Sequence, residues 1–206
     1  MTTLNVVTPD QWAAARAELR AQEIEEAKAR AAVNAARRQL PVTPVEQDYV
    51  LDGPTGAANL ADVFEGRPQL VVYHFMFRPA WDQGCPYCSH IIDNVGHLAH
   101  MNALGTTFAT VSSASQAKIQ PFRERMGWQQ PWYSDTSGEF NRDFDATDER
   151  GAISVLLRDG GTVYRAYAAY DDAIDLHLLD YTYLDLTALG LAPGGPWPKH
   201  HDRYGS

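Results

Sequence analysis

The chain of 206 residues contains only two cysteines, Cys85 and Cys88, so no framework of several disulfides holds it together. Basic residues are also few, because 17 Lys and Arg stand against 26 Asp and Glu, which gives a formal net charge of -9. A nucleic acid or an anionic membrane would require a basic face on its partner. The composition therefore argues against both and favours small molecules or proteins as partners.

Long apolar runs are absent as well. The longest, Leu70–Phe77, is far too short to cross a bilayer, and residues 1–10 have neither a cationic leader nor an apolar segment. We therefore expect a cytoplasmic protein that does not associate with a membrane. Because that compartment is reducing, it disfavours a purely structural disulfide. The two cysteines then form a redox dithiol, belong to a metal site or are incidental.

A long helix is predicted at the start of the chain. Thr8-Pro9-Asp10-Gln11 combines an N-cap residue, a proline at the first helical position and a glutamine that can close a capping box. The helix should run to about Leu40, where Pro41 ends it. Its thin apolar stripe consists of Trp12, Leu19 and Val33. Such a stripe suits packing against another surface, either the chain's own domain or the partner in a homodimer.

Strands and helices alternate in the rest of the chain. Strands are predicted at 49–51, 69–77, 107–111, 153–157 and 162–167, and helical segments at 59–64, from Cys85 past Leu98, and at 115–126. This βαβα order followed by a hairpin fits an α/β thioredoxin-like sheet. We therefore divide the chain into an N-terminal helical arm (1–45), a thioredoxin-like domain (46–190) and a C-terminal tail (191–206).

The dithiol itself lies in Gly84-Cys85-Pro86-Tyr87-Cys88, after a buried strand and at the start of a predicted helix. A helix N-terminus directs unpaired N–H groups and a positive dipole end at the first sulfur, which favours its thiolate. Cys85 is therefore the candidate nucleophile, and Cys88, one turn further on, is the candidate resolving thiol. The pattern predicts a thiol-disulfide oxidoreductase that acts on a small-molecule or protein substrate and requires no cofactor.

Five motifs occur together between residues 67 and 204: Arg67-Pro68-Gln69-Leu70, Tyr73-His74-Phe75-Met76-Phe77, Gly84-Cys85-Pro86, Met126-Gly127-Trp128, and Trp197 with His201-Asp202-Arg203-Tyr204. Together they resemble a large bacterial family of thioredoxin-like proteins described as predicted dithiol-disulfide oxidoreductases. The resemblance implies a thioredoxin-like fold of the peroxiredoxin type with an N-terminal helical extension, and Cys85 and Cys88 as its redox centre. The tetrapeptide Cys-Pro-Tyr-Cys is also similar to the glutaredoxin active site. The expected reductant is accordingly either the thioredoxin or the glutathione system.

The sequence differs from thioredoxin-type enzymes and from peroxiredoxins at two positions near the dithiol, and each difference argues against one type of reaction. Thioredoxin-type enzymes place a cis proline just before the strand that faces the dithiol, where this chain has Arg150-Gly151-Ala152-Ile153. This weakens the case for general protein-disulfide exchange. The peroxiredoxin motif has Thr or Ser three residues before its reactive cysteine, where this chain has Asp82, and Pro79 is one residue too close. The second departure argues against a peroxidase that uses the peroxiredoxin mechanism. A binding module that has lost its catalytic ability is a third class of function, beside the oxidoreductase and the metal-dependent protein.

Histidines near the dithiol provide the alternative. His74 lies on the strand that leads to the site, and His90 follows Cys88 by two residues. Cys85 and Cys88 with His74 or His90 would form a mixed sulfur and nitrogen set that suits copper or zinc. The protein would then be a metal-dependent enzyme or a metal carrier. His74 is the first histidine to test, because an imidazole in an otherwise apolar strand needs a partner.

Overall fold

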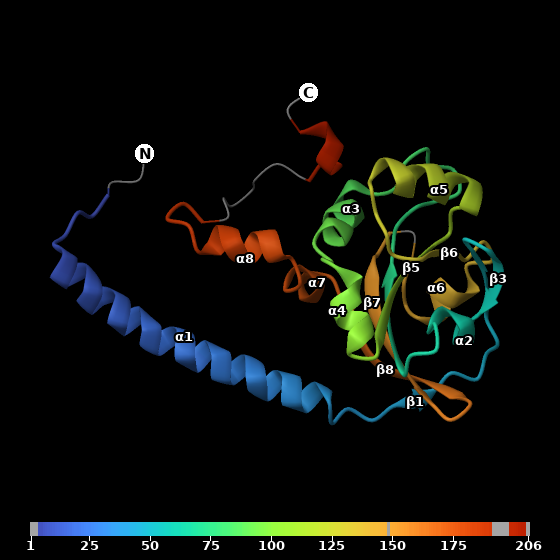
Figure 1. Cartoon of the computed structure of the whole chain (residues 1–206), viewed down its shortest axis with the longest axis horizontal. Helices are drawn as coiled ribbons and strands as arrows, with labels where there is room; N and C mark the ends of the chain where they lie inside the picture. Colours follow the sequence, from blue (N-terminus) through green and yellow to red (C-terminus); the bar gives the residue numbers. More distant parts are fainter. Residues whose placement is uncertain (1–3, 148, 191–197, 205–206) are drawn as a thin grey trace. The chain divides into compact units, whose positions relative to one another are not determined.

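The computed structural model describes residues 4–147, 149–190 and 198–204 (Figure 1). The chain divides into two compact units, residues 1–41 and residues 42–206. Within the described residues, no helix combines the length and the apolar composition that crossing a membrane requires. The cytoplasmic location stays a prediction. Trp197, which belongs to the last of the five motifs, lies outside the described residues.

The first unit contains helix α1 (Pro9–Arg37), which begins as predicted. The Thr8 hydroxyl accepts a hydrogen bond from the Gln11 backbone N–H at 3.3 Å, and the Gln11 side chain accepts one from the Thr8 N–H at 3.0 Å. This reciprocal pair satisfies two N–H groups that a helix start leaves unpaired. The helix buries no residue within its own unit, and packing of its apolar stripe on the chain's own domain or on a homodimer partner stays a prediction.

The second unit contains a single sheet and several short helices. Their bounds are β1 (Thr43–Pro44), β2 (Val50–Gly53), β3 (Gly56–Asn59), α2 (Leu60–Val63), β4 (Gln69–His74), α3 (Pro86–Asp93), α4 (Leu98–Ala103), β5 (Thr106–Ser112), α5 (Gln116–Arg125), β6 (Trp132–Ser134), α6 (Glu139–Asp143), β7 (Ala152–Asp159), β8 (Thr162–Tyr170), α7 (Asp172–Asp175), α8 (Leu179–Asp185) and the 3-10 turn η1 (His201–Arg203). The strand order is β1-β8-β7-β4-β5-β6-β2-β3. Strand β4 is therefore internal, parallel to β5 and antiparallel to β7.

Three local predictions differ from the structure. Strand β4 ends at His74 rather than Phe77, since its pairing with β5 and β7 ends there. The helix after Cys85 is two helices, because Gly96 between α3 and α4 adopts a left-handed conformation with φ 71. Strands β3 and β6 were not predicted. Strand β3 consists of Gly, Ala, Ala and Asn, which lack the β-branched and aromatic side chains typical of strands, and β6 shows no alternation because all three of its residues are buried.

The sheet carries a hydrophobic cluster on each face. Residues of α3 and α5 pack with Tyr73 and Phe75 on one face, and residues of α2 and α6 pack with Leu70 and Val72 on the other. Figure 1 shows α3 and α4 on one side of the strands and α2 and α6 on the other. Because side chains alternate along a strand, β4 sends alternate residues into the two clusters.

The cluster under α3 and α5 predicts a large stability effect at its centre. Trp132 is fully buried, lies 4.6 Å from Phe75 between ring centroids, and donates from Nε1 to Ser112 Oγ at 3.0 Å. We expect Trp132→Ala to lower the free energy of unfolding by about 3–5 kcal/mol because it leaves a cavity. Denaturant titration measures this loss.

The matched control is Trp12→Ala, since Trp12 lies on α1 with 63% of its surface exposed. That change should alter the free energy of unfolding by less than about 0.5 kcal/mol. Equal losses for the two variants would contradict the assignment of Trp132 to the core.

Candidate active site

One backbone residue, Met76, holds both cysteines. After β4 the chain passes Met76, makes a loop and returns, so that the Cys85 N–H donates to the Met76 carbonyl at 3.0 Å. The Met76 N–H in turn donates to the Cys88 sulfur at 3.4 Å. Both cysteines are free thiols; Cys85 is half-buried and Cys88 is fully buried. The end of the central strand thus fixes the dithiol.

The residues around the dithiol shape its loop and its helix. Cys85 is the N-cap of α3 and Pro86 occupies the first helical position, where a missing N–H has no cost. The Ser89 hydroxyl donates to the Cys85 carbonyl at 2.9 Å. A Cβ at Gly84 would lie only 2.5 Å from the Phe75 ring, so the loop can pack this closely only with glycine.

The two thiols differ in acidity. Hydrogen bonding from the Cys88 thiol lowers the pKa of Cys85 to about 7, although partial burial opposes this change. Burial, and then the hydrogen bond to Cys85, raise the pKa of Cys88. Near neutral pH the half-exposed sulfur is therefore substantially thiolate, while the buried sulfur keeps its proton.

The segment after β8 packs on α3. The Tyr87 hydroxyl donates to Asp175 of α7, and His90 Nε2 pairs with Asp180 of α8. The Asp180 N–H also donates to Asn94 Oδ1 at 3.0 Å. Burial raises the pKa of Asp175. These contacts place a carboxyl beside the dithiol helix, and the sequence spacing did not indicate it.

The described part of the C-terminal tail packs against the dithiol loop. His200 is buried, with Nε2 2.9 Å from the Gly84 carbonyl oxygen and Nδ1 3.1 Å from the Arg125 guanidinium. His201 Nδ1 lies 2.8 Å from Asp93 Oδ1. The tail therefore contacts the residue that immediately precedes Cys85.

The structure does not bring the four residues of the metal alternative together. His74 Nδ1 lies 2.8 Å from Asn141 Oδ1 and its Nε2 lies 2.9 Å from Ser154 Oγ, so both ring nitrogens have partners. Burial lowers the pKa of His74 to about 4. Its ring stacks on Phe140, in the cluster on the far face from Cys88. His90 is engaged by Asp180.

Across the described ranges, no group of three or more His, Cys, Asp or Glu side chains is arranged to hold a metal ion. The copper or zinc alternative therefore stays a prediction without a ligand cluster to support it. His74 is a hydrogen-bonded histidine of the core, because Asn141 and Ser154 supply the partners that its buried imidazole requires.

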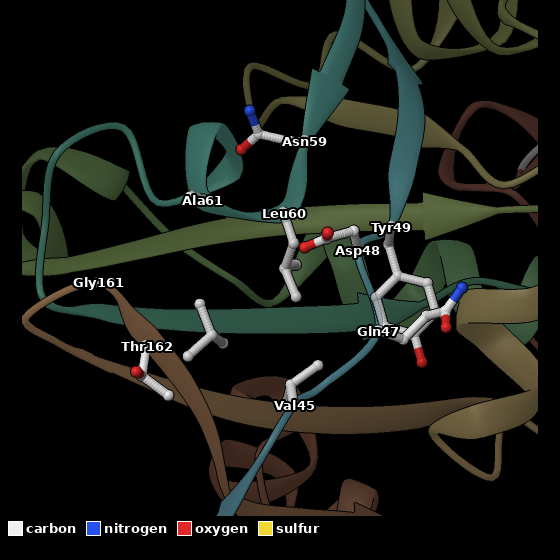
Figure 2. A pocket seen from close by; sticks show the side chains of 10 residues that line it. Val45, Gln47, Asp48, Tyr49, Asn59, Leu60, Ala61, Gly161 and Thr162 are labelled. Atoms are coloured by element: carbon white, nitrogen blue, oxygen red, sulfur yellow. The ribbon is translucent and has the colours of Figure 1, made fainter.

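A hollow elsewhere in the same unit is separate from the dithiol. Figure 2 shows this cavity of about 260 Å³, whose lining includes Asp48, Tyr49, Asn59 and Thr162. Neither cysteine lines it. The Asn59 side chain already accepts a hydrogen bond from the Asp62 N–H at 3.1 Å as the cap of α2. The hollow takes no part in the chemistry of the two thiols.

Comparison with known proteins identifies the family. A family model described as a bacterial protein of unknown function, DUF899, matches residues 1–204. The chain belongs to the DUF899 family. No curated protein matches the sequence. The match covers the helical arm as well as the sheet.

Several solved structures similar to this DUF899 chain are named as peroxiredoxins or peroxidoxins. A variant of peroxiredoxin Q from Xanthomonas campestris is 17% identical, with a TM-score of 0.51 over 68% of this chain and 98% of that one. Peroxidoxin BcpB from Mycobacterium tuberculosis is 16% identical, with a TM-score of 0.53 over 68% and 91%. A PrxQ variant from Xylella fastidiosa is 16% identical, with a TM-score of 0.52 over 69% and 94%. The predicted thioredoxin-like fold of the peroxiredoxin type is confirmed.

The difference in acidity between the thiols predicts the pH dependence of alkylation. The rate at which iodoacetamide modifies Cys85, followed by mass, should rise with pH around a midpoint of about 7. In Cys88→Ala the thiol donor is lost while the backbone N–H of residue 88 still favours the Cys85 thiolate, so the midpoint should move up from about 7 toward the ordinary value of about 8.5, and the rate at neutral pH should fall several-fold.

Cys88→Ser is the matched control because its hydroxyl can still donate to the Cys85 sulfur. It should keep most of the lowered midpoint. Identical midpoints in the native protein and in Cys88→Ala would show that Cys88 does not acidify Cys85.

Proposed function

We propose that the protein is a thiol-disulfide oxidoreductase in which Cys85 is the nucleophile and Cys88 resolves the mixed disulfide. The observation that carries this proposal is the asymmetric pair itself. A half-exposed thiol of lowered pKa stands at a helix N-terminus, and a fully buried thiol lies one turn behind it on the Met76 N–H. Sequential thiol exchange requires this asymmetry, because one sulfur attacks the substrate and the other then attacks the resulting mixed disulfide.

The reaction follows from these positions. The Cys85 thiolate attacks one sulfur of a substrate disulfide, the S–S bond breaks, and the expelled thiolate takes a proton from water. Cys88 then loses its proton and attacks the Cys85 sulfur, which forms the Cys85–Cys88 disulfide and releases the second substrate thiol. The substrate gains two electrons and the dithiol loses two. A thiol reductant of the thioredoxin or glutathione type returns those electrons.

The proposed substrate is a small-molecule or protein disulfide that can reach a half-buried sulfur. The Tyr87 hydroxyl, two residues after Cys85, donates to Asp175, and His200 contacts the carbonyl of Gly84, the residue before Cys85. These contacts restrict approach to the sulfur, which favours a slender substrate over a folded protein surface.

A hydroperoxide is the second candidate substrate. The neighbours in fold are named peroxiredoxins, and one of them, the bacterioferritin comigratory protein of Xanthomonas campestris, is described by its alkyl peroxide reduction activity. The Cys85 thiolate would attack the peroxide, forming a sulfenic acid and an alcohol, and Cys88 would convert the sulfenic acid to the disulfide with loss of water. Asp82 stands where the peroxiredoxin motif has Thr or Ser, so disulfide exchange ranks first.

The first test is a redox titration. Equilibrated in graded thiol buffers and analysed by mass after alkylation, the protein should show one reversible two-electron transition between about −270 and −180 mV. Failure to form a Cys85–Cys88 disulfide in any buffer would overturn the proposal.

Variants of the two cysteines separate the steps of turnover. Cys85→Ser should abolish reduction of a model disulfide, because no accessible nucleophile is left. Cys88→Ser should stop after one exchange and accumulate the mixed disulfide on Cys85, which mass detects. Turnover of a hydroperoxide at a rate above that of a disulfide would instead favour the second candidate.

A further inference from the structure

A buried tyrosine hydroxyl lies in the same hydrophobic cluster as the resolving thiol. Tyr73, on β4, is 1% exposed and packs edge-on against Phe75 with ring centroids 6.1 Å apart. Within the described residues its hydroxyl makes no hydrogen bond. Buried hydroxyls are nearly always paired in folded proteins, and an unpaired one beside a reactive group points to a role in another state of the reaction.

The surroundings of this hydroxyl are specific. A Cβ at Gly151 would lie 3.2 Å from the Tyr73 oxygen, so the absence of a side chain there leaves the hydroxyl its space. Burial, and then the neighbouring Cys88 sulfur, raise the pKa of Tyr73. Cys85 and Asp175 are the further groups that raise it. Tyr73 therefore keeps its proton throughout the reaction and can act only as a neutral donor or acceptor.

The Cys88 thiolate needs a hydrogen-bond donor in the resolving step. It resolves the mixed disulfide as a thiolate, although it is fully buried, and burial is the main cause of its raised pKa. The Met76 N–H donates to its sulfur at 3.4 Å. Tyr73 and Cys88 belong to the same buried cluster, and the side-chain interaction with Tyr73 lowers the pKa of Cys88, so the hydroxyl lies where it can favour the charged sulfur.

We propose that the Tyr73 hydroxyl completes a two-donor site with the Met76 N–H for the Cys88 thiolate, and so stabilises the nucleophile of the resolving step. This inference rests on the proposed exchange function and deepens it. In the resting dithiol Cys88 is a neutral thiol and a weak acceptor, so the hydroxyl stays unpaired. Once Cys85 is in the mixed disulfide, ionisation of Cys88 gives the hydroxyl a charged acceptor, and such hydrogen bonds are the stronger kind.

A single-turnover reaction with dithiobis(nitrobenzoate) separates the two steps. Attack by the Cys85 thiolate breaks the reagent's S–S bond and releases one equivalent of coloured arylthiolate. The Cys88 thiolate, its proton lost to solvent, then attacks the Cys85 sulfur and releases the second equivalent, leaving the Cys85–Cys88 disulfide. The two releases are followed in one stopped-flow trace.

Tyr73→Phe removes only the hydroxyl. The first release should keep its rate and its pH midpoint, because Tyr73 is not among the groups that shift the pKa of Cys85. The second release should slow by about tenfold, and its pH midpoint should rise, because the thiolate loses a hydrogen bond to a charged group. The melting temperature should be unchanged or higher, since the hydroxyl is unpaired at rest.

Tyr133→Phe is the matched control, because Tyr133 is buried in the cluster on the other face of the sheet. It should leave both releases unchanged. A normal second release in Tyr73→Phe, or an equal slowing of both releases together with a lower melting temperature, would overturn the inference. A native protein that releases only one equivalent would overturn the exchange function itself, and the resolving step with it.

Discussion

The two hydrogen bonds of the Met76 backbone determine the position of the dithiol. The carbonyl holds the Cys85 N–H and the N–H holds the Cys88 sulfur. Met76 lies two residues beyond β4, which is paired on both sides by β5 and β7. A strand paired on both edges is among the most rigid parts of a domain. The dithiol is therefore fixed by the sheet and does not depend on its loop alone.

The alternation of side chains along β4 places neighbouring residues on opposite faces of the sheet. Tyr73 points to the face that carries α3 and packs in the same cluster as Cys88. The next residue, His74, points to the opposite face and is bonded to Asn141 and Ser154. A displacement of one residue along the strand thus separates a side chain in the dithiol's cluster from one that is hydrogen-bonded on the far face.

Contacts remote in sequence pack on the dithiol helix and its loop. Asp175 and Asp180, from the segment after β8, bind Tyr87 and His90 of α3. His200 contacts the Gly84 carbonyl just before Cys85. Cys85 itself is half-buried, and this partial burial opposes the lowering of its pKa by hydrogen bonding from Cys88. The acidity of Cys85 therefore reflects a balance between its partner thiol and its burial.

The sequence by itself determined the features that depend on neighbours along the chain. The capping box of α1, the strand before the dithiol, Cys85 as the helix N-cap and the β7–β8 hairpin are all local, because turns, caps and hydrophobic periods involve residues a few positions apart. Only the tertiary structure decided which side chains meet across the sheet. It alone placed His74 away from Cys88 and Tyr73 beside it, and it added the short strands β3 and β6 through pairing with β2 and β5. Such contacts join residues distant in sequence, and no local period encodes them.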